Sequence, residues 1–246
     1  MCGRYTLNME AALLAERFGI HQLRIPITPR YNIAPSQMVP VIHSVEEQGE
    51  TFAILDGCSW GFASPPKTGT KGQLIVNARM EGLFERQMFK KLLVDRRCLI
   101  PADGFYTWTT ENGKKIPYLV RLKSKKPFFF AGLWKEVSDK NKLAGKVCIV
   151  ITVPANDQLS EIESRMPAIL RPEDEDKWID LTLQDKAELL AMLNPYPSDE
   201  MEYFRVSKLV NSTKTDDVSC ARPLTGEEEE KRPAAKAAQL SLFDPA

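Results

Sequence analysis

The sequence predicts an α+β fold with a single strand-rich domain and peripheral helices. Short β-branched or aromatic runs bounded by turn residues recur through the chain, which is typical of strands. Stretches with helical periodicity are few and short by comparison. The chain has 246 residues, 43% of them hydrophobic, enough for one sizeable domain. No internal repeat is visible, so we expect one domain with a tail rather than a repeat array.

The expected elements alternate with breaks rich in proline, glycine and serine. A short amphipathic helix is expected over 10–18, followed by strands over 38–43, 51–60 and 74–78. A helix over 83–94 precedes strands over 97–100, 104–108, 118–122, 127–133 and 147–152, with Asn112-Gly113 as a turn signal. Helical patterns return over 173–179 and 184–193. The elements outline a strand-rich α+β domain.

The composition changes towards the C-terminus. We predict a domain over residues 2–212, a disordered linker over 213–238 and a C-terminal peptide over 239–246. The stretch 225–238 is charged and then alanine-rich, with Pro233 and no hydrophobic face. Three apolar side chains then follow Gln239, namely Leu240, Leu242 and Phe243. A disordered tail cannot bury these side chains within its own chain, whereas a hydrophobic groove on a partner can bind them.

Charge and cysteine usage narrow the classes of function. Lys+Arg 33 against Asp+Glu 33 gives zero net charge, so any DNA contact depends on a local patch rather than on the overall field. Cys58, Cys98, Cys148 and Cys220 lack the spacing of metal ligands, so we expect buried reduced thiols, no metal site and no cofactor. No apolar run can span a bilayer and no leader precedes Cys2, so we expect a cytoplasmic protein.

Cys2 directly follows the initiator methionine. Removal of Met1 would give it a free α-amine beside its thiol, a pair that no internal cysteine has. The α-amine titrates near ~7.7–8.0 and a thiol near ~8.5, so a fraction of each is nucleophilic at neutral pH. The pair can attack an aldehyde as an imine and close a five-membered thiazolidine. The alternative from the residues alone is a frayed terminus in which Cys2 is incidental.

Six short stretches carry a further pattern. They are Cys2-Gly3-Arg4-Tyr5, Arg30-Tyr31-Asn32-Ile33-Ala34-Pro35, Trp60-Gly61-Phe62, Val76-Asn77-Ala78-Arg79-Met80-Glu81, Cys98-Leu99-Ile100-Pro101-Ala102-Asp103-Gly104-Phe105-Tyr106 and Arg165-Met166-Pro167. Their order and spacing resemble the SOS-response-associated peptidase (SRAP) family over roughly residues 2–212. The resemblance implies a SRAP-like domain that captures abasic sites in single-stranded DNA as a covalent thiazolidine on the N-terminal cysteine. The family name records an older peptidase proposal, in which self-cleavage exposes Cys2.

The resemblance also implies roles for individual residues. Asn77 matches an active-site asparagine that would hold the sugar or the Cys2 amine, where the residues alone favour a turn or strand-end role. Arg79 and Arg165 match arginines that grip phosphates around the lesion, and we expect Arg4 in the same cleft, because a guanidinium fork meets two phosphate oxygens at once. Pro35 is placed near the DNA path, with a structural turn as the alternative.

Two positions depart from the family pattern. Thr107 stands where the family usually has a glutamate that acts as general acid/base, and Glu163 stands where it has a histidine. His21 and His43 match no catalytic position. In one interpretation Glu163 supplies the missing carboxylate, with a pKa raised by desolvation. In the other the protein is a degenerate paralogue that binds single-stranded DNA or the replisome with little chemistry.

The tail peptide gives a separate hypothesis. Gln239-Leu240-Ser241-Leu242-Phe243 closely resembles the pentapeptide with which bacterial repair proteins bind the sliding clamp. Leu240, Leu242 and Phe243 would enter an apolar groove while Gln239 forms a hydrogen bond at one end. The linker would then tether the domain at the replication fork. The rivals are a cysteine peptidase, for which no histidine is suitably placed, and a binding module without chemistry.

Overall fold

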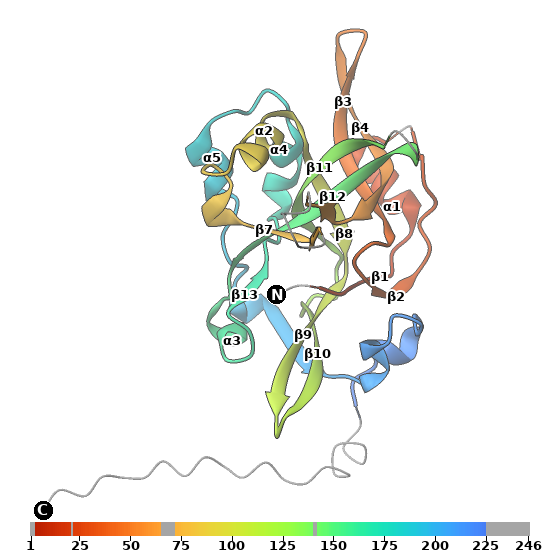
Figure 1. Cartoon of the computed structure of the whole chain (residues 1–246), viewed down its shortest axis with the longest axis vertical. Helices are drawn as coiled ribbons and strands as arrows, with labels where there is room; N and C mark the ends of the chain where they lie inside the picture. Colours follow the sequence, from red (N-terminus) through yellow and green to blue (C-terminus); the bar gives the residue numbers. More distant parts are fainter. Residues whose placement is uncertain (1–2, 21, 65–71, 140–141, 225–246) are drawn as a thin grey trace, which may run out of the picture.

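A computed structural model of the chain describes residues 3–20, 22–64, 72–139 and 142–224. Most of its strands form two sheets, and the helices lie around them (Figure 1). The fold is a strand-rich α+β domain, which confirms the predicted fold class. No helix in the described ranges is both long and apolar enough to cross a membrane.

The larger sheet closes on itself. Its strands follow the order β11-β8-β3-β4-β12-β13, and β11 also pairs with β12, so the first five form a barrel. Their bounds are β3 (Met38–Glu47), β4 (Glu50–Trp60), β8 (Arg97–Ala102), β11 (Phe128–Asp139), β12 (Lys142–Pro154) and β13 (Arg165–Pro167). Short β7 (Asn77–Arg79) runs parallel to β12. Strand β12 therefore carries two short neighbours, β7 and β13, beyond the barrel itself.

The second sheet has the order β14-β10-β9-β1-β2 and begins next to the N-terminus. Its strands are β1 (Tyr5–Leu7), β2 (Arg30–Ile33), β9 (Gly104–Glu111), β10 (Lys114–Leu122) and β14 (Met201–Arg205). A separate ladder pairs β5 (Phe62–Ala63) with β6 (Leu74–Ile75). Gly61, with φ +127°, begins this ladder, and a Cβ there would lie 2.7 Å from Leu74 Cγ. Only glycine fits this left-handed, crowded turn.

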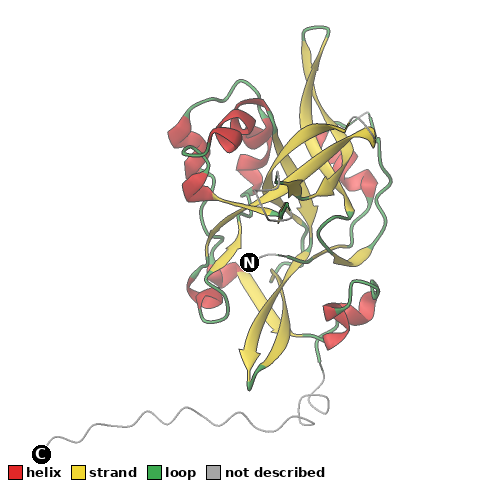
Figure 2. Ribbon diagram, viewed as in Figure 1, coloured by secondary structure: helices red, strands yellow, loops and turns green. Residues whose placement is uncertain are grey.

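The helices are short and cover one side of the barrel more than the other. Figure 2 shows α2 (Gln87–Asp95), α4 (Glu175–Ile179) and α5 (Lys186–Ala191) grouped together, with α1 (Ala11–Phe18) apart from them. Buried Arg97 joins two of them by donating to the carbonyls of Leu93 in α2 and Trp178 in α4. These last-turn carbonyls have no partner within their helices, so the guanidinium satisfies them.

The remaining short helical elements lie in loops. They are α3 (Asp157–Ser160), η1 (Met80–Gly82), η2 (Pro172–Asp174), η3 (Ser198–Glu200), η4 (Lys208–Asn211) and η5 (Val218–Cys220).

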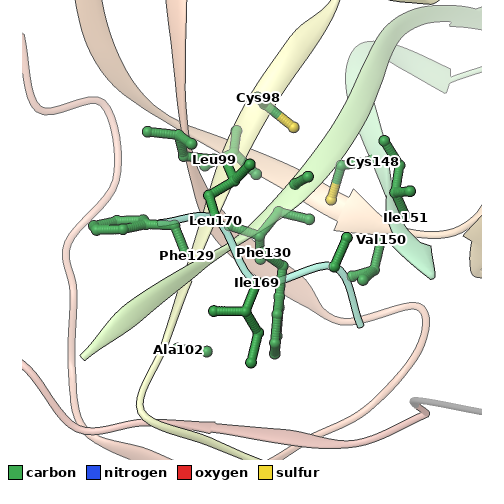
Figure 3. Packing of buried hydrophobic residues seen from close by; sticks show 14 of the residues in the cluster. Cys98, Leu99, Ala102, Phe129, Phe130, Cys148, Val150, Ile151, Ile169 and Leu170 are labelled. Carbon is green, nitrogen blue, oxygen red and sulfur yellow. The ribbon is translucent and has the colours of Figure 1, made fainter. Parts of the chain in front are cut away.

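The core lies inside the barrel and is built from the inward faces of its strands (Figure 3). Phe130 of β11 and Ile151 of β12 are fully buried, and the thiols of Cys98 and Cys148 point into the same packing. Cys58 and Cys220 are also free and buried, so the prediction of buried reduced thiols is confirmed for the four internal cysteines. Burial raises the pKa of the Cys98 and Cys148 thiols well above its usual range, which keeps them unreactive.

Three expected elements differ in the structure. The helix predicted over 83–94 begins only at Gln87, because Leu83 is fully buried in a turn after η1. The strand predicted over 74–78 is two strands, β6 and β7. The folded body also runs past the linker start predicted at 213, since Asp216 and Cys220 pack against β2 and β10. Isolated contacts such as those of Asp216 and Cys220 produce no periodic pattern in the sequence.

Candidate functional site

Strand β7 presents Asn77 and Arg79 on one face. Successive side chains of a strand alternate between faces, so residues 77 and 79 point together and Ala78 points the other way. Ala78 is 1% exposed and enters the core, whereas Asn77 is half-buried and Arg79 exposed. The parallel pairing of Asn77 with Val150 and of Arg79 with Thr152 fixes this register. The predicted asparagine and arginine are thus brought together by local strand geometry.

Arg165 reaches the same place from β13. Its strand is antiparallel to β12, and its guanidinium donates from Nη2 to the carbonyl of Thr152 at 2.6 Å and from Nε to the Thr152 hydroxyl at 3.3 Å. Because Thr152 also pairs with Arg79, β12 lies between the two arginine-bearing strands. Strands β7 and β13 both lie near the centre of the view in Figure 1, and each pairs with β12.

Glu81 occupies the guanidinium fork of Arg165. Oε1 and Oε2 of Glu81 each lie 2.9 Å from a terminal nitrogen of Arg165, a bidentate pair. Hydrogen bonding from Arg165 holds the pKa of the Glu81 carboxyl below its usual range. No role was assigned to Glu81 from the sequence alone. Its position two residues after Arg79 in the same motif could have indicated that it belongs to the site.

These side chains line one cleft of about 820 Å³. Residues that line it include Gln73, Asn77, Arg79, Glu81, Glu85, Arg86, Phe89 and Arg165. Three arginines against two glutamates make the lining slightly positive, although the whole chain is neutral. We call it the Asn77 cleft. A local excess of positive charge of this kind is what any DNA contact of a neutral protein depends on.

The N-terminal strand is anchored by Tyr5. The Tyr5 ring is fully buried and packs edge-on against Trp60 at 5.4 Å and Phe130 at 5.7 Å between ring centroids. Tyr5 pairs with Phe105 of β9, and the amide of Tyr106 donates to the carbonyl of Arg4 at 3.0 Å. The direction of the chain leaving β1 towards residue 2 is therefore fixed by both packing and pairing.

Thr107 lies at the same end of β9. The register of β1 on β9, continued one step past Arg4 and Tyr106, sets Thr107 opposite Gly3. The Thr107 side chain is 6% exposed, and its hydroxyl has no hydrogen-bond partner within the described part of the chain. A buried hydroxyl can donate or accept a hydrogen bond, but it neither ionises nor takes up a proton at neutral pH and so cannot act as a general acid or base.

Arg4 and Glu163 do not line the Asn77 cleft. Arg4 Nη1 donates to Asn32 Oδ1 at 2.7 Å and to the carbonyl of Val210 at 2.5 Å, on the side of the second sheet. Glu163 is half-buried and precedes β13, and its Oε1 accepts from the amide of Ser164 at 3.1 Å. The roles predicted for both residues therefore stay predictions.

Pro35 is connected to the cleft through Trp60. It begins the turn after β2 in which Ser36 has φ +71° and donates its amide to the carbonyl of Trp60 at 2.8 Å. The indole of Trp60, which is 1% exposed, donates in turn to the carbonyl of Val76 at 3.0 Å, next to Asn77. Pro35 thus belongs to a structural turn that supports β7 through Trp60, a core residue.

Within the described ranges, neither a histidine nor a cluster of metal-binding side chains forms a second candidate site. His43 is fully buried on β3, stacked on Trp134 with ring centroids 4.1 Å apart, and desolvation lowers its pKa. Within residues 3–20, 22–64, 72–139 and 142–224, no group of three or more His, Cys, Asp or Glu side chains could hold a metal ion. His21 lies outside these residues.

Comparison with known proteins decides the family. The profile described as SOS response associated peptidase (SRAP) matches residues 1–213. The chain belongs to the SRAP family. Among curated SRAP relatives, the abasic site processing protein YoqW of Bacillus subtilis (strain 168) is 39% identical over 219 residues, covering 87% of this chain and 96% of that protein. The abasic site processing protein YedK of Escherichia coli (strain K12) is 29% identical and covers 91% of this chain and 100% of its own length.

Solved structures show the same fold. A crystal structure of a protein from Bacteroides thetaiotaomicron matches with a TM-score of 0.75 at 22% identity, over 91% of this chain and 100% of that one. A second, from Bordetella bronchiseptica, matches with a TM-score of 0.68 at 20% identity, over 84% of this chain and 100% of that one. The barrel and second sheet described above are thus the architecture of the SRAP fold.

Some predicted SRAP site residues fall outside the described residues. They are Cys2 and the clamp-binding residues Gln239, Leu240, Leu242 and Phe243. The structure places the rest of the predicted site, with Asn77, Arg79 and Arg165 in one cleft. Sequence reasoning missed Glu81 and Arg86 in the lining, and it missed Asn32 as the partner of Arg4.

Proposed function

We propose that this SRAP protein captures abasic sites in single-stranded DNA through its N-terminal Cys2 and so protects the lesion during replication-associated repair. The observation that carries the proposal is the Asn77 cleft, in which an amide side chain and two arginines converge in a neutral protein. The relatives named abasic site processing proteins support it, since they match over most of both chains. No cofactor or metal ion is required by this chemistry.

The reaction uses only the aminothiol of Cys2 and the sugar. An abasic deoxyribose opens to an aldehyde, whose carbon is attacked by the α-amine. Loss of one water gives an imine, and addition of the thiol sulfur to the imine carbon closes the thiazolidine, with the thiol proton passing to nitrogen. The steps are nucleophilic catalysis assisted by proton transfer. The product mass is therefore the sum of protein and DNA minus one water.

The proposal gives a role to three residues of the cleft and to Glu163 and Pro35 outside its lining. The Asn77 amide holds the sugar or the Cys2 amine, while Arg79 and Arg165 hold flanking phosphates by bidentate hydrogen bonds. Glu163 supplies the carboxylate for proton transfer, because the Thr107 hydroxyl cannot act as a general acid or base at neutral pH. Pro35 supports the cleft from the turn beside Trp60.

Mass spectrometry after incubation with abasic single-stranded DNA tests the proposal. We expect a heat-stable adduct at the combined mass minus one water, absent in Cys2→Ala and in a protein with residues placed before Cys2. Cys2→Ser should leave at most a labile imine, because a hydroxyl closes the ring less favourably than a thiol. An adduct of equal yield in Cys2→Ala would refute the proposal.

The same experiment separates the proposal from two rival functions, because neither rival gives an adduct. Burial of the Thr107 hydroxyl at the family's glutamate position favours a paralogue that binds DNA without chemistry. Such a protein would bind abasic and intact strands but give no adduct. A cysteine peptidase would instead cleave peptides, and it would need a base beside Cys2, which buried His43 cannot be.

Recruitment by a sliding clamp completes the proposal. The peptide Gln239–Phe243 would bind the clamp groove through Leu240, Leu242 and Phe243, and the preceding chain would tether the domain at the fork. We place the protein in the cytoplasm at the nucleoid on this basis. Tethering raises the local concentration of the domain where single strands carry lesions.

A further inference from the structure

The segment 207–220 closes over β2 and the start of β1. It contains η4 and η5 and lies beside β2 in the lower part of Figure 1. We call it the C-terminal clasp. Its apolar side chains Val210 and Cys220 are fully buried in a small cluster with Tyr106 and Leu119. The SRAP profile ends at residue 213, so half of the clasp lies beyond the family match.

Asn32 is the centre of the clasp. It is fully buried, and its Nδ2 donates towards the carbonyls of Thr215 at 2.6 Å, Ser212 at 2.8 Å and Val210 at 3.2 Å. Its Oδ1 accepts from Arg4 Nη1 at 2.7 Å. A buried amide with this many partners has one available orientation, because any rotation leaves polar atoms unsatisfied.

Asp216 fastens the other side. Its Oδ1 accepts from the amides of Tyr31 at 2.6 Å and Asn32 at 2.8 Å, and its Oδ2 forms an ion pair with Arg30. These contacts join residues 184 to 186 positions apart in the chain. Charged groups make the stronger hydrogen bonds, so Asp216 holds the clasp on β2. The clasp carbonyls that accept from Asn32 are thereby kept in place.

Arg4 transmits this arrangement to the N-terminus. Besides Asn32, its guanidinium donates to the carbonyls of Val210 at 2.5 Å and Asn211 at 3.4 Å. Arg4 is two residues from Cys2, so their Cα atoms are at most about 7.6 Å apart at ~3.8 Å per residue. With Tyr5 buried in the core, the Arg4 side chain fixes the backbone of the first described residues after the nucleophile.

We propose that Arg4, Asn32 and Asp216 are positioning residues for the N-terminal nucleophile, with the C-terminal clasp as their support. This inference rests on the proposed function for its chemical consequence. A nucleophile must meet an aldehyde held on DNA from one direction, and a displacement of about 1 Å can cost roughly 10²-fold in rate. The clasp supplies that direction without touching the substrate.

The test uses the full chain with Asp216→Ala and Arg4→Gln, and with Asp217→Asn as matched control. Asp217 is the next residue, and within the described ranges the hydrogen bonds of its side chain come from Ser219 in the same turn. Asparagine caps such turns equally well. Three quantities are measured. They are amide hydrogen exchange of residues 3–7, the single-turnover rate of adduct formation on abasic DNA, and the rate with glyoxylic acid, a small free aldehyde.

Both test variants should increase exchange of residues 3–7 and slow adduct formation on DNA at least about tenfold. The rate with glyoxylic acid should stay unchanged, because a free aldehyde approaches from any direction. Arg4→Lys should recover part of the DNA rate, since an ammonium reaches one carbonyl but not two. Asp217→Asn should match wild type in all three measurements.

Several results overturn the inference. Unchanged exchange in both variants, an unchanged DNA rate, or an equal fall of the DNA and glyoxylic acid rates would each do so, the last because it means a damaged nucleophile. If wild type forms no adduct on DNA, the proposed function fails, and exchange alone decides whether the clasp orders the N-terminal strand.

Discussion

Glu81 and Arg165 form a bidentate pair in the lining of the Asn77 cleft, with each carboxylate oxygen 2.9 Å from a terminal nitrogen of the guanidinium. The Glu81 side chain is 49% exposed and that of Arg165 12%. Ion pairs with an exposed partner contribute only about 0.2–1 kcal/mol, so a phosphate can displace the carboxylate. In the proposed function, Glu81 therefore orients the fork of Arg165 until a phosphate replaces it.

The first prediction is that Glu81→Gln binds intact single-stranded DNA more tightly than wild type. The substitution removes the charge that competes with phosphate for Arg165, so a several-fold gain in affinity is expected. Fluorescence anisotropy at low salt measures it. Glu85→Gln is the control, because it removes an equal charge from the same cleft, outside the Arg165 pair. Equal gains in both variants would mean that only net charge matters.

The second prediction concerns the phosphate contacts of the cleft. Arg79→Ala and Arg165→Ala should each weaken single-strand binding and lower its salt slope by roughly 0.7, the value for one lost phosphate contact. Arg171→Ala serves as control, since Arg171 pairs with Glu200 outside the cleft. Affinities across a salt series give the slopes. Unchanged slopes for both cleft arginines would place the DNA elsewhere.

The third prediction addresses the relocated acid/base group. Glu163→Gln should slow adduct formation by about 10²-fold without altering DNA affinity, as for other positioned proton-transfer groups. Thr107→Glu should partly rescue that variant, because it returns a carboxylate to the family's position. Single-turnover rates against pH for both single variants and the double variant are the measurement, with melting curves to verify folding at buried Thr107. Equal rates for Glu163→Gln and wild type would remove Glu163 from the mechanism.

The fourth prediction links stability to pH through Glu175. Burial raises the pKa of Glu175 to about 8, although Arg17 Nη2 lies 2.6 Å from its Oε2. The folded state then binds this proton more tightly than the unfolded state, so the stabilisation is complete below the ordinary carboxyl pKa and is lost as pH rises through about 8. Glu175→Gln should therefore gain stability relative to wild type between mildly acidic and alkaline pH.

Thermal unfolding of Glu175→Gln at several pH values checks the trend. Glu161→Gln, exposed at the end of α3, controls for net charge, because Glu161 does not contribute to the raised pKa of Glu175. A constant difference from wild type across the pH range would show that Glu175 is charged in the folded protein throughout.

The fifth prediction tests the tail. A peptide spanning Gln239–Phe243 should bind a bacterial sliding clamp with roughly micromolar affinity, as expected of a short segment that loses entropy on ordering. Replacing Leu242 and Phe243 by alanine should abolish binding, whereas Ser241→Ala should retain it. In the full chain the double substitution should leave adduct formation in solution intact. Calorimetry without saturation at high peptide concentration would make the motif a coincidence.

The sequence indicated the cleft residues and the long strands, but it did not indicate the short strands. Asn77 and Arg79 share a face because of strand parity, which is a local property, and the motif order brought in Arg165. The long strands β3, β4 and β12 were also predicted, since each has a clear β-branched run. Short β1, β2 and β14 were missed, because strands of three to five residues draw their stability from neighbours rather than from pattern.

Long-range polar contacts were beyond sequence reasoning. Arg30 and Asp216 are 186 residues apart, and nothing in either segment indicates the other. The same holds for Arg4, whose contacts with Asn32 and η4 no pattern indicated, while its predicted role in DNA binding stays a prediction. Its motif position identified it as important, but the motif could not distinguish a phosphate from a carbonyl as the partner. Only the closure of the chain into two sheets determines that choice.

The contact of Asp216 with β2 also bears on how the protein avoids self-association. Strand β2 is the last strand of its sheet, and the open edge of such a strand invites pairing with another chain. The Asp216 carboxylate occupies the amides of Tyr31 and Asn32 at that edge. A chain cut at residue 213 would free these donors for strand addition. Truncations designed from the family boundary therefore carry an aggregation risk that chains retaining residues 214–224 avoid.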